Sequence, residues 1–286
     1  MFRTSNPAFN NDAYKPAQTW DDLGGSQTFG TDDSLAAARR TQASKPNTMT
    51  INGTVTKSAL LISVCLVTAL PAWHLTLDGT IPPIAGVLGA MLLGFLLFIV
   101  TSFNPKMSPV TALPFAACEG VLVGSLSALY AVSFATQDAE GPIALNTDLI
   151  LNAGLLTFGI FGGLLAAYAT KLVRPNKLFY NITIVGTMGV CLYALIAIVA
   201  SFAFGSFDLI SVYSPHNGGL VSIGFSLLLV GLASANLVLD FDMVNVAVRN
   251  RSPKYMEWFS GMALLVTLVW LYIEVLRLLA KLSSRD

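Results

Sequence analysis

The sequence predicts an all-α polytopic membrane protein with seven transmembrane helices. Hydrophobic residues make up 54% of the chain and charged residues only 11%, whereas a soluble domain carries about 25% charged residues. The mean hydropathy of +0.67 agrees with a membrane protein. Apolar stretches of about 20 residues or more are long enough to cross a bilayer as helices. Seven such stretches cover residues 58–77, 82–103, 110–134, 149–173, 178–205, 218–248 and 255–282.

Turn-forming residues separate the first stretches. Pro82 and Pro83 begin the second stretch, and Asn104 and Pro105 end it, because proline lacks a backbone N–H and disfavours helix in the residue before it. The connections are short, so consecutive helices should be antiparallel neighbours. The sixth and seventh stretches are long, and we expect them to be tilted or to extend beyond the hydrocarbon.

Small residues recur at four-residue spacing in the second and third stretches and crowd the fourth. Such residues let helix backbones approach closely inside a membrane, so we expect close helix contacts there. They are Gly86, Ala90 and Gly94, then Gly120 and Gly124, then Gly159, Gly162 and Gly163.

Residues 1–57 differ from the rest of the chain. They are rich in polar residues, glycine and proline, and such a segment buries too little apolar surface to offset its ordering entropy. They also lack the apolar core of a cleavable signal peptide. We therefore expect a mostly disordered cytoplasmic segment over 1–57 and a transmembrane domain over 58–286.

Lys and Arg residues predict the orientation, with one exception. They precede the first stretch and occupy the even-numbered connections, whereas the odd-numbered connections hold acidic residues and no Lys or Arg. This asymmetry predicts a multi-pass protein of the cell membrane with its N-terminus in the cytoplasm. Seven spans then place the C-terminus outside. Arg277, Lys281 and Arg285 are the exception, and they leave a re-entrant seventh segment open as an alternative.

The inventory of reactive residues argues against an enzyme. His74 and His216 lie at the outer boundary, so an intramembrane Ser–His hydrolase would lack its base. Cys65, Cys118 and Cys191 fall within spans without metal-ligand spacing and are most simply reduced apolar residues. We expect no enzymatic activity, no cofactor, no firm metal site and no nucleic-acid partner.

Four carboxylates inside the apolar stretches are the main functional signal. They are Glu119, Asp240, Asp242 and Glu274. A charged side chain at the bilayer centre costs roughly 2.5–3.5 kcal/mol on insertion scales, so such residues usually line a bundle interior or a wet path. We therefore expect a protein that handles cations or protons.

The two aspartates of the sixth stretch cannot face the same site. A separation of two residues rotates them by about 200° around a helix. Asn236 shares a face with Asp240 at i,i+4, and Asn245 shares another with Asp242 at i,i+3. Each aspartate has a structural alternative, namely a carboxylate that hydrogen-bonds to a neighbouring helix.

The other acidic residues have different settings. Glu119 lies near mid-depth, where it should be protonated or hydrogen-bonded because desolvation disfavours the charged form. Glu274 and Arg277 are spaced to form an ion pair that snorkels to the interface. Glu257 suits the N-terminal dipole of the last helix. If the third, sixth and seventh helices adjoin, the intramembrane carboxylates would form a discontinuous acidic ladder across the membrane.

Several motifs resemble the Bax inhibitor-1 family, in its bacterial YccA-like branch. The most specific ones lie in the last third of the chain. The motifs are LDFD at residues 239–242, PKYMEW at 253–258 and WLYIEVLRLL at 270–279, supported by NPAF at 6–9 and FAACEG at 115–120.

This resemblance implies a seven-helix fold with the last helix central and a pH-sensitive calcium leak. In the family an aspartate that ends the sixth helix pairs with one in the seventh, and Asp242 or Asp240 matches the first. Thr267 stands where many relatives have the second. Asp240 from the same helix, or Glu274 further along, would then have to replace the missing partner.

Three functions follow from these observations. The first is a passive path for calcium ions or protons through the bilayer, controlled by the intramembrane carboxylates. The second is a non-conducting membrane protein that modulates a protease or a stress response through contacts with a membrane-protein partner. The third, a proton-coupled transporter, is weaker because no inverted repeat is evident.

Overall fold

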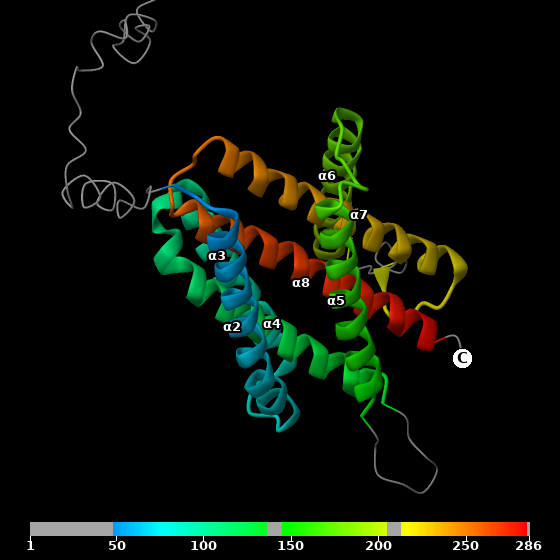
Figure 1. Ribbon diagram of the computed structural model, residues 1–286. Helices are drawn as coiled ribbons and strands as arrows, with labels where there is room; N and C mark the ends of the chain where they lie inside the picture. The colour runs from blue at the N-terminus through cyan, green and yellow to red at the C-terminus, as the bar shows by residue number, and fades with distance from the viewer. Residues whose placement is uncertain (1–47, 136–144, 205–212, 285–286) are drawn as a thin grey trace, which may run out of the picture. The chain divides into compact units, whose positions relative to one another are not determined.

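The computed structural model describes residues 48–135, 145–204 and 213–284. Within them are seven helices long and apolar enough to cross a membrane, as the sequence predicts, and a 3-10 turn, η4 (Pro105–Met107), precedes the third. The helices, labelled as in Figure 1, are α2 (Ile51–Leu77), α3 (Pro83–Phe103), α4 (Ser108–Ser133), α5 (Thr147–Ala169), α6 (Lys177–Phe204), α7 (Leu220–Arg249) and α8 (Met256–Ser283).

The first helix begins at Ile51 rather than at residue 58. Thr50 is its N-cap, and the Thr50 side chain accepts a hydrogen bond from the backbone N–H of Gly53. This bond satisfies one of the donors that a helix start leaves open. Residues 51–57, which the sequence places in the polar segment, therefore form the first turns of α2. The predicted disorder of residues 1–47 lies outside the described residues.

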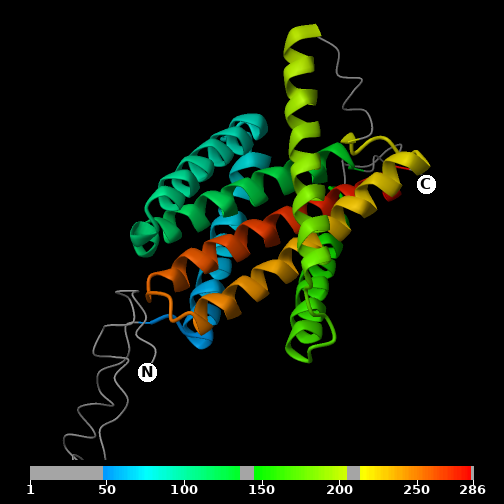
Figure 2. The same ribbon diagram turned by 90° about the horizontal axis from the view of Figure 1, so that it is seen from above.

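Residues 47–286 form one compact unit. Its apolar interior has two clusters, one built from α4, α5, α7 and α8 and the other from α2, α4 and α8. Helix α8 contributes to both clusters and packs against α2, α4, α5 and α7. Figures 1 and 2 show α7 and α8 side by side over much of their length. The last helix is continuous from Met256 to Ser283, without the break of a re-entrant segment.

Glycines allow α2 and α4 to approach closely, as predicted for the third span. A Cβ atom at Gly120 would overlap the hydroxyl of Thr68, and one at Gly124 would overlap the carbonyl of Ala69. The fourth span differs from the prediction. A Cβ atom at Gly159, Gly162 or Gly163 would meet nothing within 4 Å among the described residues, because this face of α5 is not packed against another helix.

Three helix starts meet at one end of the unit. The backbone N–H of Met49, just before α2, donates to the Ser252 carbonyl at 2.7 Å. Ser108, the first residue of α4, donates its hydroxyl to the Tyr255 carbonyl at 2.8 Å. The loop that precedes α8 is thus fixed to the starts of α2 and α4.

Candidate functional site

Asp240 lies at the interface of α7 and α8. Its polar neighbour on α8 is the hydroxyl of Thr267, which also donates to the Ala263 carbonyl at 3.2 Å. The Oδ2 atom of Asp240 is buried and has no hydrogen-bond partner among the described residues. Buried polar atoms are rarely left without a partner. Asp240 is therefore the aspartate that faces the last helix, opposite the position where the family resemblance implies a second acidic residue.

Asp242 faces the other side of α7. Its Oδ1 accepts a hydrogen bond from the Tyr168 hydroxyl of α5 at 2.9 Å, and its Oδ2 accepts one from the Tyr180 hydroxyl of α6 at 2.6 Å. Asn245, one turn further on, donates to the Tyr168 hydroxyl at 3.0 Å. The predicted common face of Asp242 and Asn245 therefore exists. Both carboxylate oxygens of Asp242 serve to connect three helices.

Asn236 does not supply the donor that Asp240 lacks. Its side-chain amide donates to the Thr187 hydroxyl of α6 at 2.8 Å and to the Leu232 carbonyl at 2.9 Å. The sequence predicts that Asn236 shares a face with Asp240, but the two residues turn to different helices. Residues four apart differ by about 40° around an α-helix. This offset is enough to turn Asn236 toward α6 and Asp240 toward α8.

Glu119 lies on the side of α4 that faces α3. Its Oε1 atom is 3.9 Å from the position that a Cβ atom at Gly94 would take. The side chain is half-buried, and no hydrogen bond to it is found within the described ranges. Glu119 is thus near α3, whereas Asp240 is at the α7–α8 interface.

Glu274 is neutralised by its neighbours. Its Oε2 atom is 2.5 Å from Arg277 Nη1, and its Oε1 accepts hydrogen bonds of 3.2 Å from Trp270 Nε1 and the Tyr213 hydroxyl. The Arg277 guanidinium lies 3.6 Å from the centre of the Tyr213 ring. The predicted ion pair is confirmed, but the expected snorkelling is wrong. Glu274 and Arg277 are 1% and 7% exposed because Tyr213 and the neighbouring helices cover them.

The acidic ladder that we expected is therefore not formed as one row. Helices α4, α7 and α8 do adjoin, but Glu119 turns toward α3 and Glu274 is paired with Arg277. Asp242 is satisfied by tyrosines. Over the described parts of the chain, no group of three or more His, Cys, Asp or Glu side chains could hold a metal ion. Among the carboxylates of the described residues, that of Asp240 has a buried oxygen without a hydrogen-bond donor.

Glu257 has a larger structural role than the sequence suggested. It is 1% exposed and accepts hydrogen bonds of 3.0 Å from both the backbone N–H and the hydroxyl of Thr50. It also forms an ion pair with Lys57 of α2, whose ammonium lies 5.4 Å from the centre of the Trp258 ring. Sequence reasoning assigned Glu257 only to the dipole of its own helix, because nothing in the sequence pairs residues 50 and 257.

Seven apolar helices that bury acidic side chains between them define a polytopic membrane protein, embedded in a lipid bilayer. A family model described as Bax inhibitor 1 like matches residues 6–284, and the chain therefore belongs to the Bax inhibitor-1-like family. Comparisons with curated proteins and with solved structures give no match. The assignment to the YccA-like branch stays a prediction.

Proposed function

We propose that this protein is a non-enzymatic cation leak, with Ca²⁺ as the favoured permeant, whose opening depends on the protonation of Asp240. One observation carries the proposal. The Oδ2 atom of Asp240 is buried at the α7–α8 interface, and no described residue donates a hydrogen bond to it. A buried charge without a partner is costly, so the packing of α7 against α8 depends on the protonation state of this group.

The direction of the pH effect follows from that cost. When Asp240 is charged, separation of α7 from α8 stabilises it, because water or a cation then reaches the carboxylate. When Asp240 is protonated, no charge is buried and the two helices stay packed. Ca²⁺ prefers carboxylate and carbonyl oxygens as ligands. Flux should therefore rise with pH and fall on acidification.

Asp242 is a natural control for Asp240. It lies two residues away on the same helix, but two tyrosine hydroxyls satisfy its carboxylate. Protonation of Asp242 would therefore act on the contacts among α5, α6 and α7 rather than on the α7–α8 interface. Replacement by asparagine should therefore affect the pH dependence of flux differently at the two positions.

The experiment measures Ca²⁺ flux into phosphatidylcholine liposomes that contain only the purified protein. We expect wild-type flux to increase from about pH 5 to about pH 8, a range in which a buried carboxyl group titrates. Asp240→Asn should give low flux at every pH, because the amide keeps the size of the side chain but cannot acquire a charge. Asp242→Asn should keep the pH response. A wild-type pH profile in Asp240→Asn would contradict the proposal.

The alternative function is a non-conducting modulator of a protease or a stress response. It is favoured by the observation that Asp242 and Glu274 are both used in contacts within the unit, as structural carboxylates would be. The same liposomes separate the two functions. Absence of Ca²⁺ flux at every pH, from protein that is folded and monodisperse, would favour the modulator.

We also infer that the N-terminus lies in the cytoplasm, that the C-terminus lies outside, and that the membrane is the cell membrane. The support is the bias of Lys and Arg toward the even-numbered connections, together with an odd number of spans. A reporter enzyme fused after Asp286 and active only in the cytoplasm should be silent. An active fusion would reverse the assignment of the C-terminus.

A further inference from the structure

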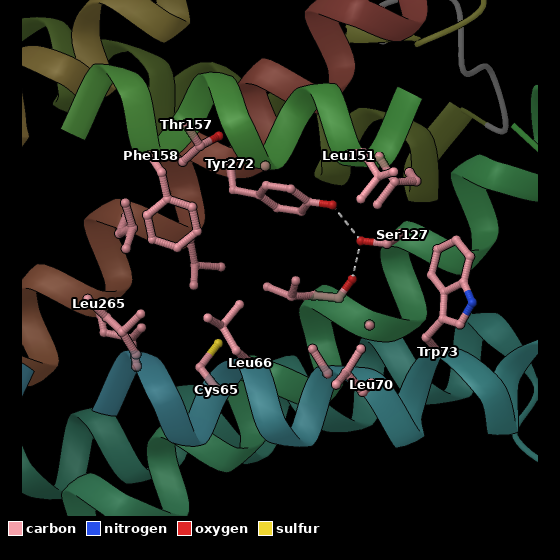
Figure 3. Close-up of a pocket in the computed structure, with 18 of the residues that line it drawn as sticks. Cys65, Leu66, Leu70, Trp73, Ser127, Leu151, Thr157, Phe158, Leu265 and Tyr272 are labelled. Atoms are coloured by element: carbon pink, nitrogen blue, oxygen red, sulfur yellow. Dashed lines mark hydrogen bonds between the residues drawn. The ribbon is translucent and has the colours of Figure 1, made fainter. Parts of the chain in front are cut away.

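A cavity of about 540 Å³ lies between α2 and α5, with α4 and α8 behind it. Helices α2 and α5 both pack against α4 and α8, and the cavity is the space between them. Figure 3 shows Leu66 and Leu70 of α2 on one side of this space and Leu151 and Phe158 of α5 on the other. We call this space the α2–α5 crevice.

The lining of the crevice is mostly apolar, and three of its hydroxyl groups already have partners. The hydroxyls of Ser127 and Tyr272 are 2.6 Å apart, and Ser127 also donates to the Val123 carbonyl. The Thr157 hydroxyl donates to the Ala153 carbonyl at 2.7 Å. A water molecule needs two to four polar partners to occupy a cavity, so the crevice is a poor site for water. None of the described residues that line the crevice carries a carboxylate, which separates it from the proposed cation path.

The crevice is open toward the surroundings of the helices. Leu66, Leu70, Leu151 and Phe158 line it and are also exposed. Because these residues belong to membrane-spanning helices, the medium at the opening is the hydrocarbon of the bilayer. Side chains that line an empty void lose dispersion contacts. An acyl chain of a surrounding lipid would restore these contacts if it entered the crevice.

The length of the crevice matches one leaflet. On α2 it extends from Ile62 to Trp73, and on α5 from Thr147 to Phe158. At 1.5 Å per residue each stretch is about 16 Å long, and one leaflet contributes about 15 Å of the roughly 30 Å hydrocarbon thickness. Trp73 and Thr147 lie near the ends of their helices, where a headgroup would sit, and Trp is favoured at that level.

We propose that the α2–α5 crevice binds one acyl chain of a membrane phospholipid. The chain enters beside Trp73 and Thr147 and extends to mid-membrane along the apolar side chains of both helices. Recognition is by shape and apolar contact, with the headgroup outside the crevice. The site is independent of the proposed cation leak, because it neither contains nor contacts Asp240.

The glycines of α5 provide a test with a matched control. Gly154 lines the crevice and Gly159 does not, and a Cβ atom at either position would meet nothing within 4 Å among the described residues. Gly154→Leu should fill the crevice, whereas Gly159→Leu adds the same side chain outside it. Ala69→Leu fills the crevice from α2 and serves as a second variant if Gly154→Leu is not monodisperse.

The measurement is native mass spectrometry of protein reconstituted with phosphatidylcholine, extracted and washed in detergent. We expect one retained phosphatidylcholine on the wild type and on Gly159→Leu, and at least a several-fold lower retained fraction on the crevice-filling variant. Three results would overturn the proposal. They are no retained phospholipid on the wild type, equal retention by all variants, and an added mass that belongs to detergent or to another apolar molecule.

Discussion

Two aspartates that are two residues apart have opposite environments. Asp242 accepts hydrogen bonds from two tyrosine hydroxyls, whereas Asp240 has a buried carboxylate oxygen to which no described residue donates. The helical rotation of about 200° between them could be predicted from the sequence. The choice of which one faces α8 could not, because it depends on how α7 is rotated against its neighbours. Packing of side chains far apart in the sequence sets that rotation.

The ion pair of Lys57 and Glu257 joins the start of α2 to the start of α8 and should stabilise the fold. Breaking a buried pair on one side costs about 3–5 kcal/mol. Lys57→Met should lie toward the lower end of that range, because Glu257 keeps the two hydrogen bonds from Thr50 and Lys57 is 17% exposed. We expect a clearly lower melting temperature in detergent. Lys254→Met changes an exposed lysine at the same end of the unit and should leave the melting temperature nearly unchanged.

A double variant distinguishes the interaction between the two charges from a loss of side-chain packing. Replacement of Glu257 by Gln in the Lys57→Met background removes the uncompensated charge. The double variant should therefore be more stable than the sum of the two single effects implies. Strict additivity would mean that the two side chains do not interact.

The helices themselves were predictable to different degrees. Apolar stretches and prolines located all seven, and the start of α2 was the largest error. Its first residues are too polar to be read as part of a span, and the Thr50 cap and the Glu257 contact fix their helical form. Small residues were an incomplete guide to helix contacts. Gly120 and Gly124 lie against α2, but a Cβ atom at Gly159 would meet no described residue within 4 Å.

Because of this difference, replacement by alanine should have opposite effects on stability at Gly159 and Gly120. Alanine has the higher intrinsic helix propensity by about 1 kcal/mol, so Gly159→Ala should slightly raise the melting temperature. At Gly120 the added methyl group would overlap Thr68 and the Cys65 carbonyl. Overpacking of this kind costs about 1–3 kcal/mol and should outweigh the gain in propensity. Gly120→Ala should therefore lower the melting temperature, and an increase would show that the α2–α4 contact is looser than described.

For the whole molecule, the class of fold followed from composition and length, because a bilayer admits few alternatives to apolar helices. The arrangement of the helices did not follow. The sequence predicts a discontinuous acidic ladder if the third, sixth and seventh spans adjoin, but the carboxylates lie at separate interfaces. Hydropathy reports the depth of a residue and not the helix that it faces. The family resemblance added the expectation of a pair of acidic residues between the sixth and seventh spans, and Asp240 and Thr267 lie at that interface.

The boundary of the folded unit gives the last prediction. The compact unit begins at residue 47, so removal of residues 1–45 should leave a monodisperse protein with the melting temperature of the full chain. Removal of residues 1–50 takes away five more residues, among them Met49, which is 2% exposed and bonded to Ser252, and Thr50, which caps α2 and binds Glu257. Loss of a cap alone costs about 1 kcal/mol.

The longer deletion also leaves Glu257 without either hydrogen bond from Thr50, and a buried acceptor that loses its donors carries a further cost of about 1–3 kcal/mol. It should therefore melt at a clearly lower temperature than the shorter one, measured in the same detergent. Equal melting temperatures for the two deletions would mean that the Thr50–Glu257 contact does not stabilise the unit. Loss of monodispersity in the shorter deletion would mean that residues 1–45 are part of the fold.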